Sequence, residues 1–216
     1  MHLDEKDALD VAADLYIPAP RVHEAGTTPD GIVSIRMDYI EGESLEDLWP
    51  TMPEEERRDI CRQLREIIIS MQSAESKTGV IGSCSGGLVR ECRRMGEYTG
   101  GPYQDEADFN NYVANLITTT PTDIRNALRG QLRTDHRIVF THGDLSQHNI
   151  LIKDMKIIGL IDWEFAGWYP EYWEYVKFFD VQAKNSDWRE YAKYVFPRAY
   201  YDQLAAFQGI LRWGIP

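Results

Sequence analysis

A polar loop held between short apolar segments constrains the fold more than any other feature of the sequence. RIVFT (137–141) precedes this loop, ILI (150–152) follows it, and KIIGLID (156–162) comes after a turn at Lys153-Asp154. Short runs of β-branched and apolar residues bounded by turn residues are typical of strands. The sequence therefore predicts three short strands that fix the position of one loop, HGDLSQHN (142–149).

The loop and the last strand carry side chains suited to phosphoryl transfer. Asp144 and Asn149 lie five residues apart in the loop, and Asp162 ends the next strand, thirteen residues after Asn149. Phosphoryl transfer needs a carboxylate that orients the attacking hydroxyl and further oxygen ligands that hold Mg²⁺ against the phosphates. An Asp-to-Asn spacing alone is common by chance, so the prediction depends on the His-Gly-Asp context, the strand frame and the second Asp together.

Helical periodicity dominates the rest of the chain. EKDALDVAADL (5–15) and PEEERRDICRQLREIIISMQS (53–73) each place apolar residues on one face, and the second begins with Pro and acidic residues. IVSIRMDYI (32–40) predicts a strand, and Ser44 predicts the N-cap of a brief helix. Further helices are predicted over 108–117 and 123–132 and around 171–180, 187–193 and 199–212, with loops over 79–87 and 96–106.

Composition excludes several classes of function. The net charge of −12, from 35 acidic and 23 basic residues, opposes binding to nucleic acid. An acidic surface favours a cationic small molecule, or simply keeps a protein soluble. The three cysteines form no CxxC pair, so neither a disulfide framework nor a zinc knuckle is predicted. An acidic start and the lack of a long apolar run predict a soluble, cytoplasmic protein that does not bind membranes.

These residues resemble the aminoglycoside phosphotransferase and choline kinase family, in particular its fungal branch. The family carries HGDLxxxN followed by a strand that ends in IDWE, which stand here as HGDLSQHN (142–149) and GLIDWEFAGWYPEYWE (159–174). IPAPRV (17–22), MDYIEGESLEDLW (37–49) and GGPY (100–103) are similar to further family landmarks. The resemblance implies an α+β, protein-kinase-like fold with a reduced N-terminal lobe (1–39), a connector (40–43) and a mainly helical C-terminal lobe (44–216).

Roles follow from the resemblance residue by residue. It implies Asp144 as the catalytic base, His142 as the brace of the catalytic loop, and Asn149 and Asp162 as Mg²⁺ ligands. Glu5 matches the helix Glu that pairs with a phosphate-binding Lys. The segment whose backbone meets the adenine of ATP matches four residues, Met37, Asp38, Tyr39 and Ile40.

The front of the chain departs from the family pattern. No GxGxxG occurs, and no Lys precedes Glu5, although the family carries a glycine-bearing phosphate loop and a strand Lys there. Either the sequence is a truncated version or another group holds the nucleotide. The implied function is transfer of the γ-phosphate of ATP, or of GTP, to a hydroxyl of a small molecule. The alternative is a pseudokinase-like module that binds a nucleotide or another ligand, and a metal-dependent hydrolase matches the loop less well.

Other residues near the motif have a functional and a structural interpretation. Glu164 either reaches the metal or a cationic substrate, or is a solvated or paired acid. The aromatic residues after Asp162 are predicted to be core, with Trp168 as the exception that faces a substrate. His142 and His148 lie six residues apart without a third soft ligand, so they predict no zinc site.

Overall fold

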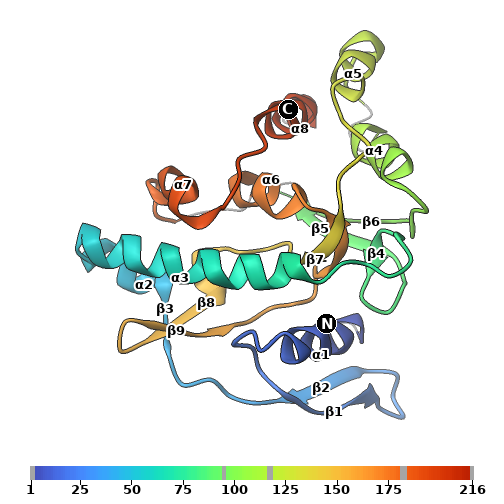
Figure 1. The fold of residues 1–216 in the computed structure, drawn as a ribbon. Helices are drawn as coiled ribbons and strands as arrows, with labels where there is room; N and C mark the ends of the chain where they lie inside the picture. The colour runs from blue at the N-terminus through green and yellow to red at the C-terminus, as the bar shows by residue number, and fades with distance from the viewer. Residues whose placement is uncertain (1–2, 94–95, 116–118, 181–183, 215–216) are drawn as a thin grey trace.

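The structure is a computed structural model, and it describes residues 3–93, 96–115, 119–180 and 184–214. Its longest helix, α3 (Glu54–Ser73), runs through the middle of the molecule (Figure 1). The remaining α-helices are α1 (Asp4–Asp14), α2 (Leu45–Leu48), α4 (Glu106–Asn115), α5 (Thr122–Arg129), α6 (Trp173–Asp180), α7 (Ala192–Val195) and α8 (Tyr201–Leu211). Short 3₁₀ turns are η1 (Trp49–Thr51), η2 (Gln147–Asn149), η3 (Trp188–Tyr191) and η4 (Arg212–Gly214).

The strands form small antiparallel sheets. β1 (Val22–Thr27) pairs with β2 (Val33–Met37), and this hairpin lies beside α1 at the N-terminal side of the molecule (Figure 1). One three-stranded sheet has the order β3-β8-β9, and the other has the order β4-β10-β7. The strands of these two sheets are β3 (Glu43–Ser44), β4 (Gly82–Ser83), β7 (Ile138–Thr141), β8 (Ile150–Lys153), β9 (Lys156–Leu160) and β10 (Gly167–Pro170). β5 (Val89–Arg93) and β6 (Gly96–Gly100) form a separate pair.

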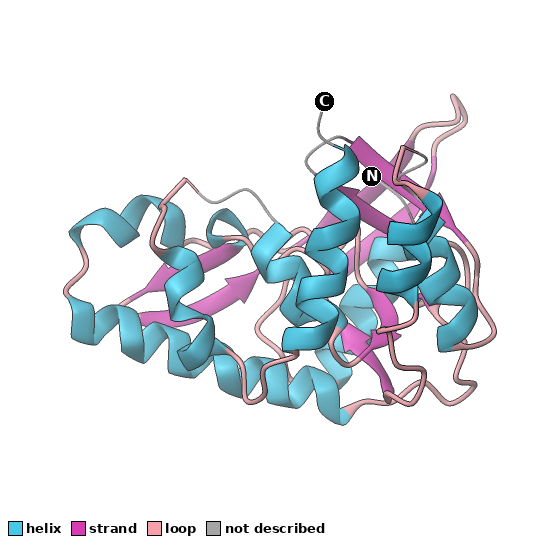
Figure 2. Ribbon diagram, turned by 90° about the horizontal axis from the view of Figure 1, so that it is seen from above, coloured by secondary structure: helices cyan, strands magenta, loops and turns pink. Residues whose placement is uncertain are grey.

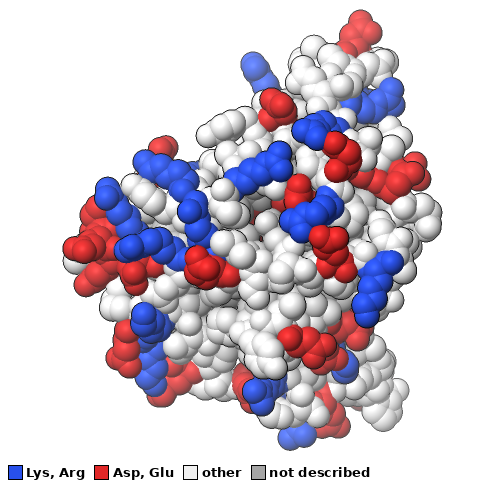
Figure 3. All heavy atoms as spheres, in the orientation of Figure 1, with Lys and Arg blue, Asp and Glu red and all other residues white. Residues whose placement is uncertain are grey.

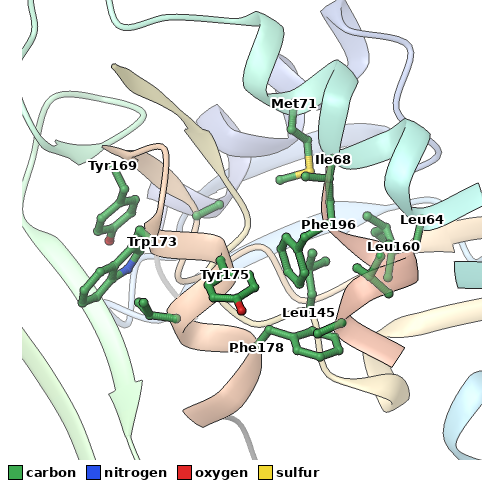
Figure 4. Close-up of a cluster of buried hydrophobic side chains, with 14 of the residues drawn as sticks. Leu64, Ile68, Met71, Leu145, Leu160, Tyr169, Trp173, Tyr175, Phe178 and Phe196 are labelled. Atoms are coloured by element: carbon green, nitrogen blue, oxygen red, sulfur yellow. The ribbon is translucent and has the colours of Figure 1, made fainter. Parts of the chain in front are cut away.

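α3 lies between the β3-β8-β9 sheet and the C-terminal helices α6, α7 and α8, while α1 lies beside the β1–β2 hairpin (Figure 1), and Figure 2 shows the same molecule from above. Leu64, Ile68 and Met71 on α3 point into a buried cluster with Leu145 and Leu160 from the predicted loop and strand (Figure 4). The same continuous core includes Ala8, Leu9 and Ala12 of α1 and Phe207 and Ile210 of α8. Burial of apolar area in one cluster therefore fixes the N-terminal helix against the strands that carry the loop.

The helices and strands predicted around the loop are present, with ends shifted by a few residues. Ser44 caps α2, because its hydroxyl accepts a hydrogen bond from the Glu46 amide at 3.1 Å. The prediction of a loop over 96–106 is wrong, because β6 occupies its first half and pairs with β5. β4 lies within the predicted loop over 79–87, and β1, β3, β5 and β10 were not predicted either. In β1 and β10, polar residues, Gly and Pro hide the period-two pattern.

Basic and acidic side chains are interspersed on the face shown in Figure 3. Within the described ranges, no helix is both long and apolar enough to cross a bilayer.

Candidate active site

The predicted loop begins where β7 ends, and its first turn requires a glycine. Gly143 has φ +84°, a left-handed conformation that residues with a Cβ rarely adopt. A Cβ at this position would also lie 2.8 Å from the Phe165 carbonyl oxygen. The chain can therefore reverse between His142 and Asp144 only because the middle residue has no side chain.

His142 connects the loop to the strand end that precedes Asp162. Its Nδ1 lies 3.2 Å from the Asp144 amide, which donates to it, and its Nε2 lies 3.1 Å from the Ile161 carbonyl oxygen, to which it donates. One acceptor and one donor together define a neutral imidazole with its proton on Nε2. Burial agrees with this state, since it lowers the pKa of His142 to about 4. The ring is fully buried and contacts Trp163 with 4.5 Å between ring centroids.

Asn149 lies directly against Asp144. Its Nδ2 donates to the Asp144 backbone oxygen at 3.0 Å and to the carboxylate Oδ2 at 3.2 Å. The nitrogen of the amide is therefore directed at Asp144, and the amide oxygen Oδ1 remains available as a ligand. The Asn149 backbone oxygen accepts a hydrogen bond from the Ile161 amide at 3.0 Å, which joins the loop to the last strand a second time.

Asp162 follows this strand in a strained backbone conformation. Its φ of 65° is left-handed, a region in which non-glycine residues are uncommon and costly. Burial raises the pKa of the Asp162 carboxyl, and the charge of Asp144 raises it further. Burial likewise raises the pKa of Asp144, which is 9% exposed. The structure thus brings two carboxylates and one amide oxygen into one electrostatic environment, where a cation would relieve the repulsion.

The donor set is suited to magnesium. Mg²⁺ prefers oxygen ligands, takes one or two carboxylates from the protein, and completes its shell with water and phosphate. The Asp162 carboxylate and the Asn149 amide oxygen provide such ligands. Among the residues that the structure describes, no three His, Cys, Asp or Glu side chains form a metal-binding cluster. Both nitrogens of His142 are already hydrogen-bonded, which removes it as a partner of His148 in a zinc site.

Sequence comparison identifies the family. The phosphotransferase enzyme family matches the chain over residues 3–207. This protein belongs to that family. It is also 27% identical over 107 residues to an aminoglycoside 3'-phosphotransferase of Enterococcus faecalis. That match spans 42% of this chain and 40% of the enterococcal enzyme, so the chain matches less than half of that relative's length.

Solved structures confirm the predicted protein-kinase-like fold. A thermostable mutant of aminoglycoside phosphotransferase APH(4)-Ia superposes with a TM-score of 0.67 at 18% identity, covering 99% of this chain and 75% of that one. Aminoglycoside-3'-phosphotransferase of type VIII gives 0.62 at 16% identity, over 98% and 79% of the two chains. Wild-type aminoglycoside 2'-phosphotransferase-IIIa, in its GDP complex, gives 0.64 at 14% identity, over 98% and 72%.

Glu5, predicted to match the lysine-pairing Glu of the family, lies beside the segment that carries Asp162, the predicted metal ligand. The backbone of Trp163 hydrogen-bonds to its carboxylate, and Asp162 and Glu164 act on it electrostatically. Burial raises the pKa of Glu5, and the two neighbouring acids raise it further. The structure therefore brings Glu5 and Glu164 together beside Asp162, where the side-chain charges acting on Glu5 are negative.

The segment predicted to meet adenine lies along the start of the connector. The Asp38 carboxylate accepts hydrogen bonds from the His23 ring at 2.7 Å and from the Arg21 amide at 3.2 Å. Both oxygens of the carboxylate are therefore bonded to residues at the start of the β1–β2 hairpin. Tyr39 is 90% exposed, whereas Met37 packs against the core. Ile40 lies over β9, so closely that a Cβ on Gly159 would come within 2.6 Å of its Cδ1. The role of their backbone in binding adenine stays a prediction.

The aromatic residues after Asp162 are core, as predicted. Trp163, Tyr169, Tyr172 and Trp173 are all buried, whereas Trp168 is only half-buried. The Trp168 ring contacts Phe140 and lines a surface pocket formed with residues 75–86. Trp168 therefore faces this surface pocket, and its predicted contact with a substrate stays a prediction.

The sequence reasoning missed Glu174, which holds the start of the loop. Its carboxylate accepts hydrogen bonds from the His142 amide at 2.6 Å and from the Gly143 amide at 3.2 Å. Burial raises the pKa of Glu174 to about 7, although both amides lower it. One turn further along α6, Lys177 is buried and lies 3.1 Å from Asp180. Charged residues at this spacing in an otherwise apolar helix are the signal that identifies such anchors.

Proposed function

We propose that this protein transfers the terminal phosphate of ATP or GTP to a hydroxyl group of a small molecule. The observation that carries the proposal is the contact between Asn149 and Asp144, which positions a carboxylate for the hydroxyl beside an oxygen ligand for the metal. Family membership gives the reaction class, and the contacts of the loop support the assignment of roles within it.

Each residue has a definable task in this reaction. The Asp144 carboxylate orients the acceptor hydroxyl and takes up its proton as the oxygen attacks phosphorus. Asn149 keeps Asp144 in place through its Nδ2 and presents Oδ1 to the metal together with Asp162. Bound Mg²⁺ would neutralise charge on the phosphates. His142 and Glu174 fix the loop, so that these groups need little rearrangement.

Substrates are proposed from chemistry and from the neighbours. One APH(4)-Ia mutant was solved with ADP and hygromycin B, another with AMP-PNP and hygromycin B, and the 2'-phosphotransferase-IIIa with GDP. We propose a hydroxyl-bearing small molecule as acceptor, with a cationic one favoured by the acids Glu5, Asp162 and Glu164 near the site. We propose lobe boundaries of 1–39 and 44–216 with a connector at 40–43.

A transfer assay tests the proposal. Radiolabelled ATP and GTP are offered with a panel of amino alcohols, sugars and aminoglycosides, to the wild type and to Asp144→Asn. We expect label on at least one acceptor with the wild type and a loss of about 10²-fold or more with Asp144→Asn. Equal transfer by both proteins would refute the assigned base.

One observation favours a second function. Glu5 lies beside the acids Asp162 and Glu164, and these negative charges do not by themselves stabilise the negatively charged phosphates of a nucleotide. A nucleotide-binding module without catalysis is the alternative. Calorimetry that shows Mg²⁺-dependent nucleotide binding, combined with no transfer to any acceptor, would favour this module. Transfer only in a version extended by a family-like glycine loop and Lys would instead identify a fragment of an enzyme.

A further inference from the structure

The Asp4 carboxylate, in the first turn of α1, is bound by β4 and by the turn that follows it. The hydroxyls of Ser83 and Ser85 both donate to Asp4 Oδ1, at 3.3 and 2.5 Å. Arg90 Nε lies 3.7 Å from the other oxygen, Oδ2. The side chains of Asp4 and Arg90 are only 26% and 19% exposed. These contacts of Asp4 with Ser83, Ser85 and Arg90 form a clasp on both oxygens of the carboxylate.

The turn that holds Asp4 is closed by its own hydrogen bonds. Ser83 Oγ accepts from the Gly87 amide at 3.0 Å, and the Ser83 backbone oxygen accepts from the Gly86 amide at 2.9 Å. Gly86 has φ +81°, a left-handed conformation that favours glycine. Asp4 is therefore attached to a defined element of the structure.

This element is in register with the start of the loop that carries the predicted base. In the β4-β10-β7 sheet, Ser83 is paired with Gly167, and Gly167 is paired with Thr141. Thr141 directly precedes His142, whose ring accepts a hydrogen bond from the Asp144 amide. Because neighbouring strands lie about 4.8 Å apart, two strand spacings separate Ser83 from Thr141, or about 10 Å. The clasp therefore fixes the first turn of α1 at one level relative to the loop.

The next residue of α1, Glu5, contacts the segment that carries the predicted metal ligand. Glu5 is buried, and its carboxylate is hydrogen-bonded to the Trp163 backbone. Trp163 directly follows Asp162, whose left-handed φ of 65° persists only where the surrounding structure holds it. Asp4 and Glu5 are adjacent in one helical turn, so the clasp limits how far Glu5 can move from this backbone.

We propose that Asp4 is a positioning residue of the candidate active site, and that its clasp holds Glu5 against the backbone next to Asp162. This inference rests on the proposed function, in which Asp162 is a metal ligand. Partners that orient a metal ligand from outside the coordination shell contribute strongly to metal affinity. The apolar face of α1 is buried in the core apart from the clasp, so loss of the clasp should loosen the first turn and leave the fold intact.

Two readouts report the clasp and the metal site separately. Cys84 lies between the two serines of the clasp, and burial raises the pKa of its thiol, so rapid thiol labelling at Cys84 in the native protein reports an open clasp. Cys61, which is fully buried on α3, reports global unfolding, and mass spectrometry identifies which cysteine is labelled. The Mg²⁺ concentration for half-maximal AMP-PNP binding, measured by calorimetry, reports the metal site.

Four variants of the full chain test the order of the contacts. Asp4→Ala opens the clasp, Glu5→Ala removes the contact with Trp163 and leaves the clasp closed, and the double variant tests whether Asp4 acts through Glu5. Asp10→Ala is the matched control, because Asp10 is an exposed acid of the same helix that is hydrogen-bonded to Lys6.

We expect Asp4→Ala to be labelled at Cys84 about 10-fold faster than the wild type while Cys61 stays protected. Glu5→Ala should keep Cys84 protected. Both single variants should need about 3- to 10-fold more Mg²⁺, and the double variant no more than Glu5→Ala alone. Asp10→Ala should match the wild type in both measurements.

Three outcomes would overturn the role of Asp4 while leaving the proposed function intact. They are unchanged labelling of Cys84 in Asp4→Ala, an unchanged Mg²⁺ requirement in Asp4→Ala, and additive effects of the two substitutions in the double variant. A wild type whose AMP-PNP binding does not depend on Mg²⁺ would overturn both the role of Asp4 and the proposed function.

Discussion

Two buried groups of the candidate site give folding stability opposite dependences on pH. Glu174 has a pKa raised from 4.5 to about 7, because burial disfavours its charged form. His142 has a pKa lowered from 6.5 to about 4, for the same reason. A raised carboxyl pKa contributes stability that is present below pH 4.5 and lost as the pH rises to about 7. A lowered histidine pKa contributes stability that is present above pH 6.5 and lost as the pH falls to about 4.

The two contributions have similar size. At about 1.4 kcal/mol per pH unit, each interval corresponds to about 3 kcal/mol of unfolding free energy. In the wild type they oppose each other over the pH range in which both groups titrate, so this pair adds little net slope there. Replacing one group should make the pH dependence of stability that is due to the other group visible. Glu174→Gln should become more stable relative to the wild type as the pH rises from 4.5 to 7, and His142→Gln should become less stable as the pH rises from 4 to 6.5.

Denaturant titrations followed by fluorescence of the six tryptophans measure these slopes. Unfolding free energies are determined for both variants and the wild type at closely spaced pH values from 4 to 8, and the differences from the wild type are plotted. Taking differences cancels the contributions of titrating groups that do not interact with either substituted residue. The double variant should show the sum of the two slopes. Curves for both single variants that run parallel to the wild type would refute the assigned protonation states.

Three further outcomes are expected. Asp162→Ala should abolish the Mg²⁺ dependence of nucleotide binding in calorimetry without unfolding the protein, and an unchanged dependence would remove Asp162 as a metal ligand. Lys177→Met should lower the unfolding free energy by about 3–5 kcal/mol, because Asp180 then remains buried without its partner; an unchanged denaturation midpoint would contradict this. Cys61, fully buried and with its pKa raised by burial to about 12, should react with a thiol reagent only upon unfolding, and rapid labelling of the native protein at Cys61 would contradict its burial.

Local patterns predicted the parts of the fold that depend on neighbouring residues. β7, β8 and β9 were predicted because β-branched runs bounded by turn residues specify strands without help from the rest of the chain. α3 was predicted from its apolar stripe, whose residues now lie in the core. β10 was missed because it consists of Gly-Trp-Tyr-Pro, and its pairing with β4 and β7 determines its conformation. Tertiary pairing overrode weak local propensity there.

The same distinction applies to the candidate site. The proximity of Asp144 and Asn149 was predictable because both belong to one short loop, and Asp162 follows through the next strand. The direction of Glu5 was not predictable, because its contact with the Trp163 backbone joins residues far apart in the chain. Glu174 could only have been suspected, since a charged residue in an apolar helix indicates a buried partner but does not identify it.

The anchor on α6 also means that the loop's geometry depends on the C-terminal core. Glu174 follows Trp173, which is 1% exposed and contacts Phe109 of α4 and Phe207 of α8 through its ring. A shift of this aromatic cluster would move α6. The Glu174 carboxylate, which accepts hydrogen bonds from the His142 and Gly143 amides, would move with the helix. Because His142 in turn fixes Asp144 and the strand end before Asp162, the position of the predicted base is coupled to the packing of Trp173 on the same helix. Core substitutions near Trp173 should therefore reduce phosphate transfer before they unfold the protein.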